Sequence, residues 1–293
     1  MLTRNTRRLF VLLTVIVALL VAACGGTSTP STTPTATSAA GTTPTTSKTT
    51  TTATATLKHV PTGSADLSWD PASQTLTVKI SLVGLAPNST HPAHIHAGSC
   101  KNQGAVVYPL QNVVADAHGV GTSTTKVSLS KGIPANGWYL NVHNGPGLSP
   151  ADQFLPIVCG DITNLSISTT SGVTVHIALT APPQASTGEN VSGTAQLTLT
   201  GTTLTVKLTV SGLEPNSSHA AHIHAGSCES QGNVVYPLSV VKADASGNAT
   251  VTTTINNVSS IPASGWYVNV HHSTNLSTQT GFDPVACGNV TVG

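Results

Sequence analysis

Histidine is the residue type that most needs a chemical explanation in this 293-residue sequence. There are 12 His against 11 Lys plus Arg and 10 Asp plus Glu. Eight of them recur in pairs at one constant offset along the chain: His91/His219, His94/His222, His96/His224 and His143/His271. Converging neutral imidazoles bind copper, zinc, nickel or iron. We therefore treat these eight side chains as candidate metal ligands.

The spacing of these histidines predicts how they could meet. In a β-strand, residues i and i+2 point to the same face, so His94 and His96 project together. A second predicted strand runs over Trp138–His143 and carries His143 on one face. If the two strands are neighbours, three imidazoles converge, and His91 can join them from the preceding turn. The alternative is that these histidines only hydrogen-bond loop backbones and hold a turn.

The candidate ligands lie in a unit that occurs twice. Residues 84–110 and 212–238 are identical at 21 of 27 positions. The same offset relates Trp138 to Trp266 and Cys159 to Cys287. This duplication predicts one domain over 57–179 and another over 191–293, joined by a Pro-containing linker over 180–190. A further strand is expected over 173–179, and its pattern does not say which domain owns it.

Each unit has the pattern of an all-β domain. Leu76–Leu82 and Leu204–Val210 alternate apolar and polar residues with period two, as half-buried strands do. Several such runs separated by Gly, Pro and Asn turns favour an antiparallel sandwich or barrel. Only 7% of the chain is charged, which excludes a coiled coil. Basic and acidic residues nearly balance, so nucleic acid is not an expected partner.

Two cysteines in each unit are expected to form a disulfide. Apart from Cys24, four cysteines permit three pairings. The duplication selects Cys100–Cys159 and Cys228–Cys287, because the two members of each pair then have the same separation along the chain. Closing a loop of that length contributes about 4 kcal/mol in the chain-entropy model. The rival interpretation makes Cys100 a metal-binding thiolate beside His94 and His96, which conflicts with an oxidising compartment.

The N-terminus has the features of an export signal. Arg4, Arg7 and Arg8 precede an apolar run over 9–23, which is short for a membrane-spanning helix. The run ends in Val-Ala-Ala-Cys at Cys24, which resembles the bacterial lipobox. We expect residues 1–23 to be a lipoprotein signal peptide and Cys24 to be lipidated. The protein would then be extracytoplasmic and membrane-anchored, at the cell surface or in the periplasm.

Residues 24–56 are expected to be a disordered tether. Between positions 27 and 56 more than half of the chain is Thr, and Lys48 carries the only charged side chain. Such a composition buries too little apolar area to offset the entropy of ordering the chain.

Three motifs of the unit carry a resemblance to a known family. They read Ala-His-Ile-His-Ala-Gly from Ala93, Gly-x-Val-Val-x-x-Leu from Gly104, and Gly-Trp-Tyr-x-Asn-Val-His from Gly137. They resemble the chordin-type CHRD domain and, more distantly, the Cu/Zn superoxide dismutase sandwich. The resemblance implies an eight-stranded Greek-key sandwich for each repeat. It places copper on His94, His96 and His143, and on His222, His224 and His271, with His91 and His219 as candidate fourth ligands.

The sequence also departs from the dismutase pattern. Repeat 2 has no His between His224 and His271 that could bridge copper and zinc, and the zinc-binding loop is absent. Pro156 and Pro284 stand where that family carries an anion-guiding Arg. Copper is therefore expected in preference to zinc.

Two hypotheses for the function remain open. The protein either binds copper, with storage, sequestration or weak superoxide dismutation as its use, or is a non-catalytic CHRD-type binding or adhesion module. In the second case the histidines are structural. The sequence identifies no protein or matrix partner, and whether the chain is an enzyme stays open.

Overall fold

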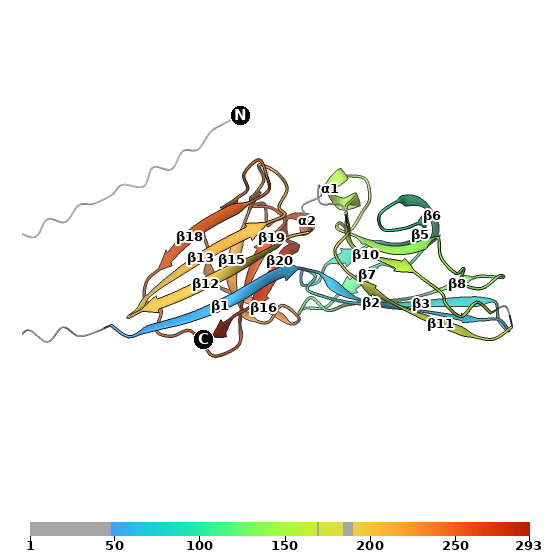
Figure 1. Ribbon diagram of the computed structural model, residues 1–293, viewed down its shortest axis with the longest axis horizontal. Coiled ribbons are helices and arrows are strands. Elements are labelled where there is room, and N and C mark those ends of the chain that lie inside the picture. The colour runs from blue at the N-terminus through green and yellow to red at the C-terminus, as the bar shows by residue number, and fades with distance from the viewer. Residues whose placement is uncertain (1–47, 169, 184–189) are drawn as a thin grey trace, which may run out of the picture. The chain divides into compact units, whose positions relative to one another are not determined.

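Two antiparallel β-sandwiches make up the part of the chain that the structure describes (Figure 1). The computed structural model describes residues 48–168, 170–183 and 190–293. The expected signal peptide, Cys24 and the tether up to residue 47 lie outside these residues, as do residues 184–189 of the expected linker. No helix within the described ranges has the length and apolarity needed to cross a membrane.

The first sandwich is built from a six-stranded and a four-stranded sheet, in the orders β11-β2-β3-β8-β7-β4 and β10-β9-β5-β6. The neighbours β5 and β9 are not consecutive in the chain, as a Greek key requires. Its elements are β2 (Thr62–Asp70), β3 (Thr75–Val83), β4 (Thr90–His91), β5 (Ala93–Gly98), β6 (Gln103–Pro109), β7 (Val113–Ala115), β8 (Gly121–Ser128), β9 (Trp138–His143), α1 (Ala151–Phe154), β10 (Pro156–Ile162) and β11 (Val173–Leu179).

The second sandwich repeats this plan with the strand orders β1-β12-β13-β18 and β16-β15-β19-β20, but β1 also pairs with β20, so that its two halves form one continuous curled sheet. Its elements are β1 (Thr50–His59), β12 (Ser192–Thr200), β13 (Thr203–Ser211), β14 (Ser218–His219), β15 (Ala221–Gly226), β16 (Gln231–Pro237), β17 (Val241–Lys242), β18 (Ala249–Ile255), β19 (Trp266–His271), α2 (Gln279–Phe282), β20 (Pro284–Asn289) and β21 (Thr291–Val292). Each sandwich has eight long strands, and its remaining strands are short. This confirms the expected all-β fold.

The period-two patterns produce the strands that they predict. In β3, Leu76, Val78, Ile80 and Leu82 are buried in the core of the first sandwich, and the residues between them face outward. The equivalent residues of β13 line the core of the second sandwich. Alternation of this kind buries one face of a sheet and leaves the other face to solvent.

Part of the stretch expected to be a tether is a β-strand. The expected boundary at residue 56 is wrong, because β1 begins at Thr50 and pairs with β12 from Thr50↔Thr200 to Leu57↔Gly193. Ala53, Ala55 and Leu57 alternate with threonines and are buried in the core of the second sandwich. The small apolar residues at every second position thus make a half-buried strand inside a Thr-rich stretch.

The position of β1 also corrects the start of the first domain at residue 57, since β1 belongs to the second sandwich. The strand predicted over 173–179 is confirmed as β11, and it belongs to the first sandwich through its pairing with β2. Leu179 lies opposite Gly63 there, just as Leu57 lies opposite Gly193. In Figure 1, β1 accordingly lies beside β12, and β11 beside β2.

Both expected disulfides are present. Cys100 is bonded to Cys159 and Cys228 to Cys287, with a Cα–Cα distance of 5.8 Å in each pair. The alternative in which Cys100 is a metal-binding thiolate is therefore wrong. Two disulfides indicate an extracytoplasmic protein.

Candidate metal centre

Adjacent strands bring the first candidate ligand set together. Strands β5 and β9 pair antiparallel, with His94 opposite Asn141 and His96 opposite Tyr139. Directly opposed residues in an antiparallel pair share a face of the sheet. His143 follows two residues after Asn141, so it lies on that same face, away from the core. The pairing of these strands, which the sequence left as a condition, is confirmed.

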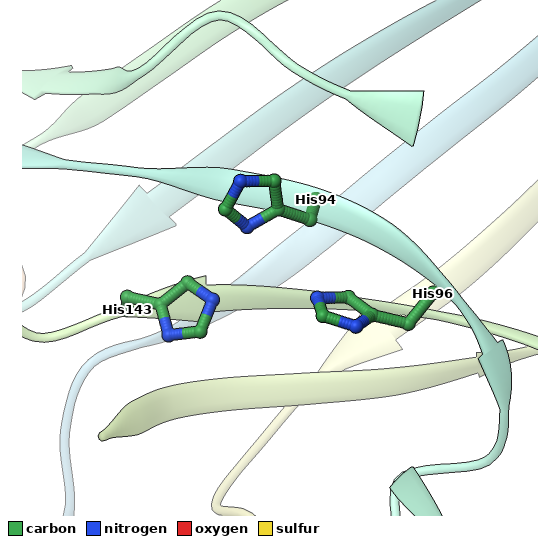
Figure 2. A group of neighbouring side chains, drawn as sticks. All are labelled: His94, His96 and His143. Carbon is green, nitrogen blue, oxygen red and sulfur yellow. The ribbon is translucent and has the colours of Figure 1, made fainter. Parts of the chain in front are cut away.

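The three imidazoles of the first sandwich converge, as Figure 2 shows. The ring centroids of His94 and His96 are 5.5 Å apart, those of His94 and His143 5.2 Å, and those of His96 and His143 6.3 Å. One ring nitrogen from each residue lies within 4.8 Å of the other two. His96 and His143 are buried, whereas His94 is half-buried, so the group opens to solvent beside His94.

Backbone carbonyls fix the tautomers of two of these histidines. His143 donates its Nδ1–H to the carbonyl oxygen of Phe154 over 2.6 Å, and His96 donates its Nδ1–H to that of Gly104 over 3.0 Å. A carbonyl only accepts, so in the neutral ring the proton is on Nδ1 and the lone pair is on Nε2. Supporting hydrogen bonds of this kind are what metal-binding histidines use to hold the ring.

The remaining ring nitrogens fit a metal ion. Nδ1 of His94 and the Nε2 atoms of His96 and His143 are buried and have no hydrogen-bond partner among the described residues. Burying such polar atoms without a partner is costly. A metal about 2 Å from each nitrogen needs nitrogens about 3–4 Å apart, so side-chain shifts of about an ångström or less are enough.

The second sandwich repeats the arrangement. The His222, His224 and His271 ring centroids lie 5.1–5.9 Å apart, and one nitrogen from each lies within 4.8 Å of the others. His271 donates its Nδ1–H to Phe282 over 2.6 Å, and His224 donates its own to Gly232 over 3.0 Å. Here Nδ1 of His222 also lies 3.0 Å from Nε2 of His271, so one proton or one metal ion can hold the two rings together.

Burial favours the neutral form of five of these imidazoles. It lowers the pKa of His94 to about 4, and nearby His143 and His96 add to the shift. It also lowers the pKa of His271 to about 4, opposed in part by the carbonyl of Phe282. The pKa values of His143, His222 and His224 are lowered as well, with burial the largest cause. Neutral rings at pH 7 leave their lone pairs available to a metal.

The prediction that His91 and His219 are fourth ligands is wrong. Both ring nitrogens of His91 are engaged: Nδ1 donates to the carbonyl of His143 and Nε2 accepts from the Ser89 hydroxyl. Nδ1 of His219 likewise donates to the carbonyl of His271, and its Nε2 lies 2.6 Å from the hydroxyl oxygen of Ser217. His91 and His219 instead fit the alternative interpretation, in which histidines hold a turn. They connect the preceding turn to the end of β9 or β19.

Sequence reasoning missed the groups that orient the ligands. The Phe154 and Phe282 rings lie 5.0 Å from those of His143 and His271, and their carbonyls accept from the same histidines. The chain has three Phe, and these two are related by the repeat offset, a signal that could have found them. A Cβ on Gly104 would clash with the Ala97 carbonyl, so glycine allows β6 to approach β5 there.

One stacking contact completes each site. The ring of His96 stacks on that of Tyr139, with centroids 5.0 Å apart, and His224 stacks on Tyr267 at 4.9 Å. Each tyrosine is fully buried and packs against the disulfide of its sandwich. Burial raises the pKa of Tyr267 to about 12. A neutral, closely packed tyrosine side chain therefore supports one histidine ring in each group.

Comparisons with known proteins agree with this architecture. The family model described as CHRD domain matches residues 25–146 and again residues 169–278. A search among curated proteins found no match to the chain. Because the two matched regions together cover well over half of its length, the chain belongs to the CHRD domain family.

Proposed function

We propose that this protein is a cell-envelope lipoprotein whose two CHRD domains each bind one copper ion through three imidazoles. The ligands would be His94, His96 and His143 in one domain and His222, His224 and His271 in the other. The observation that carries the proposal is the convergence of three ring nitrogens, with the proton of two rings held on the opposite nitrogen by a backbone carbonyl.

The donor set favours copper over the other divalent ions. Imidazole suits copper and zinc, and copper(II) has the highest affinity in the divalent first-row series. No carboxylate joins either three-histidine group among the described residues, which argues against calcium and magnesium. When bound, copper would supply one-electron redox chemistry. The chain's own groups would hold the ligand rings, shield Nε2 of His96 and His143, and leave access beside His94.

Storage or sequestration fits the surroundings better than rapid superoxide turnover. Anions reach a buried site fastest when positive charge steers them, and the positions of the anion-guiding Arg hold Pro156 and Pro284. Any enzymatic activity of the copper-loaded protein is expected to be weak superoxide dismutation.

Copper stoichiometry tests the site. The protein expressed from residue 25, freed of metal, is expected to bind about two equivalents of Cu(II), with nitrogen couplings in the electron paramagnetic resonance spectrum. His94→Ala/His96→Ala should remove one equivalent, and adding His222→Ala/His224→Ala should remove the other, because two of three ligands are lost at each site. His118→Ala/His176→Ala is the matched control and should keep both. Unchanged binding in the four-alanine variant would exclude these sites.

The lipid anchor has its own test. The features that support it are Arg4, Arg7 and Arg8, the apolar run over 9–23 and Cys24. In a bacterial host, the full chain should partition into the detergent phase of a phase-separation assay. Cys24→Ser should move it to the aqueous phase or leave the precursor uncleaved, since the thiol that carries the lipid is gone. Equal partitioning of both proteins, with the signal peptide cleaved from both, would refute the anchor.

A further inference from the structure

The site in the first sandwich depends on a short segment that holds its ligand His143 in place. His143 ends β9, and the loop after it returns to place the Phe154 carbonyl on its Nδ1. The loop is closed by a hydrogen bond from Asn144 N–H to the Leu155 carbonyl over 2.8 Å. On the other side, His91 donates its Nδ1–H to the carbonyl of His143 over 2.9 Å. Two segments, β4 with His91 and the loop after β9, thus set the position of this ligand.

A side chain of the second sandwich joins these two segments. Nε2 of Gln279, the first residue of α2, donates to the carbonyls of Thr90 and Asn144 over 2.9 and 3.1 Å. Its Oε1 accepts from the Thr90 N–H over 3.0 Å. Thr90 precedes His91 and Asn144 follows His143, so one amide bridges both segments that hold the ligand. Both the amide nitrogen and the amide oxygen of Gln279 are engaged in this bridge.

Two further hydrogen bonds between the sandwiches lie around the Gln279 bridge. Thr280 donates its hydroxyl hydrogen to Asp152 in α1 over 2.8 Å. Asp283 accepts from the Ala86 N–H over 3.3 Å, and its carboxylate lies 3.9 Å from Nε2 of His91. The α2 turn of the second sandwich therefore contacts both the turn before His91 and the α1 turn that carries Phe154.

The relation is not reciprocal. At the repeat offset, Gln279 corresponds to Ala151, whose methyl group cannot form hydrogen bonds. Asp283 likewise corresponds to Leu155. The site of the second sandwich thus receives no bridging amide or carboxylate from the equivalent positions of the first.

We propose that Gln279 is a positioning residue for the metal site of the other sandwich, so that the His94/His96/His143 site is completed by the second repeat while the His222/His224/His271 site is not. The inference rests on the proposed function, since it concerns the same copper sites. Loss of the amide would free the β4 and post-β9 segments to separate and let His143 rotate away from His94 and His96. Copper affinity would then fall at one site only.

Copper titrations of single-site proteins test this. Site 1 is isolated in a His222→Ala/His224→Ala background and site 2 in a His94→Ala/His96→Ala background. Gln279→Met keeps the length of the side chain but removes the amide. It should weaken Cu(II) binding about three- to tenfold at site 1, somewhat below the usual effect of losing a direct partner of a metal ligand, and leave site 2 within about twofold. Gln279→Glu sets a carboxylate against two carbonyls and should weaken site 1 further.

The matched control is Gln231→Met. Gln231 also donates between the two repeats, from Nε2 to the Leu85 carbonyl over 2.8 Å, but bonds neither segment that holds His143. It should leave site 1 close to its wild-type affinity. Equal weakening at both sites by Gln279→Met, or the same weakening of site 1 by Gln231→Met, would overturn the proposal in favour of general loosening of the fold.

A metal-free measurement separates this inference from the copper proposal. In the apoprotein, solvent exchange of the His143 Nδ1–H, followed by NMR with ¹⁵N-labelled histidine, should be faster in Gln279→Met than in the wild type. The His271 Nδ1–H should be unaffected. If the wild type bound no copper, the proposed function would fail, while faster exchange at His143 alone would still support the bridging role. Unchanged exchange at His143 would overturn it.

Discussion

Replacing Leu57 by alanine is expected to destabilise the second sandwich and to leave the first largely intact. Leu57 is 1% exposed and lies among the core residues of the second sandwich, although the first strand of the other one begins shortly after it, at Thr62. Truncating a buried leucine to alanine costs about 2–5 kcal/mol, because it removes buried apolar area and leaves a cavity. Hydrogen exchange followed by mass spectrometry would locate the effect.

The expected pattern is faster exchange in β12, β13 and β18, with β2, β3 and β8 close to the wild type. Leu179→Ala is the matched control, since Leu179 holds the same place opposite Gly63 that Leu57 holds opposite Gly193. It should give the reverse pattern. Protection lost in β2 and β3 on mutation of Leu57 would show that β1 belongs to the first sandwich in solution.

Acidification from pH 7 to pH 4 is expected to destabilise the metal-free protein strongly. His271 is 1% exposed, and burial lowers its pKa from 6.5 to about 4. Below pH 6.5 the unfolded chain takes up a proton on this residue while the folded chain does not. Stability is therefore full above pH 6.5 and falls as the pH drops, by about 3 kcal/mol from His271 alone when pH 4 is reached.

The other buried histidines act in the same direction, because burial also lowers the pKa values of His91, His94, His143, His219, His222 and His224. Among the carboxylates, Glu229, whose pKa is lowered from 4.5 by its hydrogen bond with Asn289, adds to the loss only near the acidic end of this window. The exposed Asp70, Asp116 and Asp244 have pKa values below the ordinary 3.8, so they lose stabilising contacts only at lower pH. The histidines therefore account for most of the loss between pH 6.5 and pH 4.

Urea denaturation in the presence of a chelator, at half-unit steps from pH 7.5 to pH 4, measures the effect. His271→Gln removes one titrating group and should flatten the dependence of the unfolding free energy on pH by at most about 1.4 kcal/mol for each pH unit. His176→Gln is the control, because His176 is exposed and paired with Asp66 on the surface. Stability that stays constant or rises on acidification would contradict the neutral, buried state of the ligand rings.

Much of the fold and the convergence of the two three-histidine groups could be predicted from the sequence. The alternation of apolar and polar residues in β3 and β13 is a local property of the sequence. A half-buried strand is the simplest structure that accounts for it. The His94/His96 pair and His143 meet because two strands with the right outward residues are neighbours. The repeat then selected one disulfide pairing out of three.

What could not be predicted depends on partners that leave no mark in residue type. His91 is the same kind of residue as the ligands and lies three positions before His94, yet a serine hydroxyl and a backbone carbonyl occupy its nitrogens. The Phe154 carbonyl that orients His143 belongs to the backbone, so the repeat marks the position of Phe154 but its side-chain type does not reveal the hydrogen bond. β1 has the Thr-rich composition of a tether, and only three small apolar residues at alternate positions distinguish it.

Because β1 belongs to the second sandwich, the two copies are not simply arranged one after the other along the chain. The ends of the first sandwich lie side by side, since Gly63 is paired with Leu179, and β1 and β12 of the second are also paired, at Leu57 and Gly193. The first sandwich is therefore an insertion between β1 and β12, two neighbouring strands of the second sandwich. Excising residues 60–191 and joining β1 to β12 by a short hairpin loop would remove one whole domain and leave the other closed. Excising the second copy instead would leave β1 without the strands that it pairs with. Only the first copy can therefore be removed without disrupting the other.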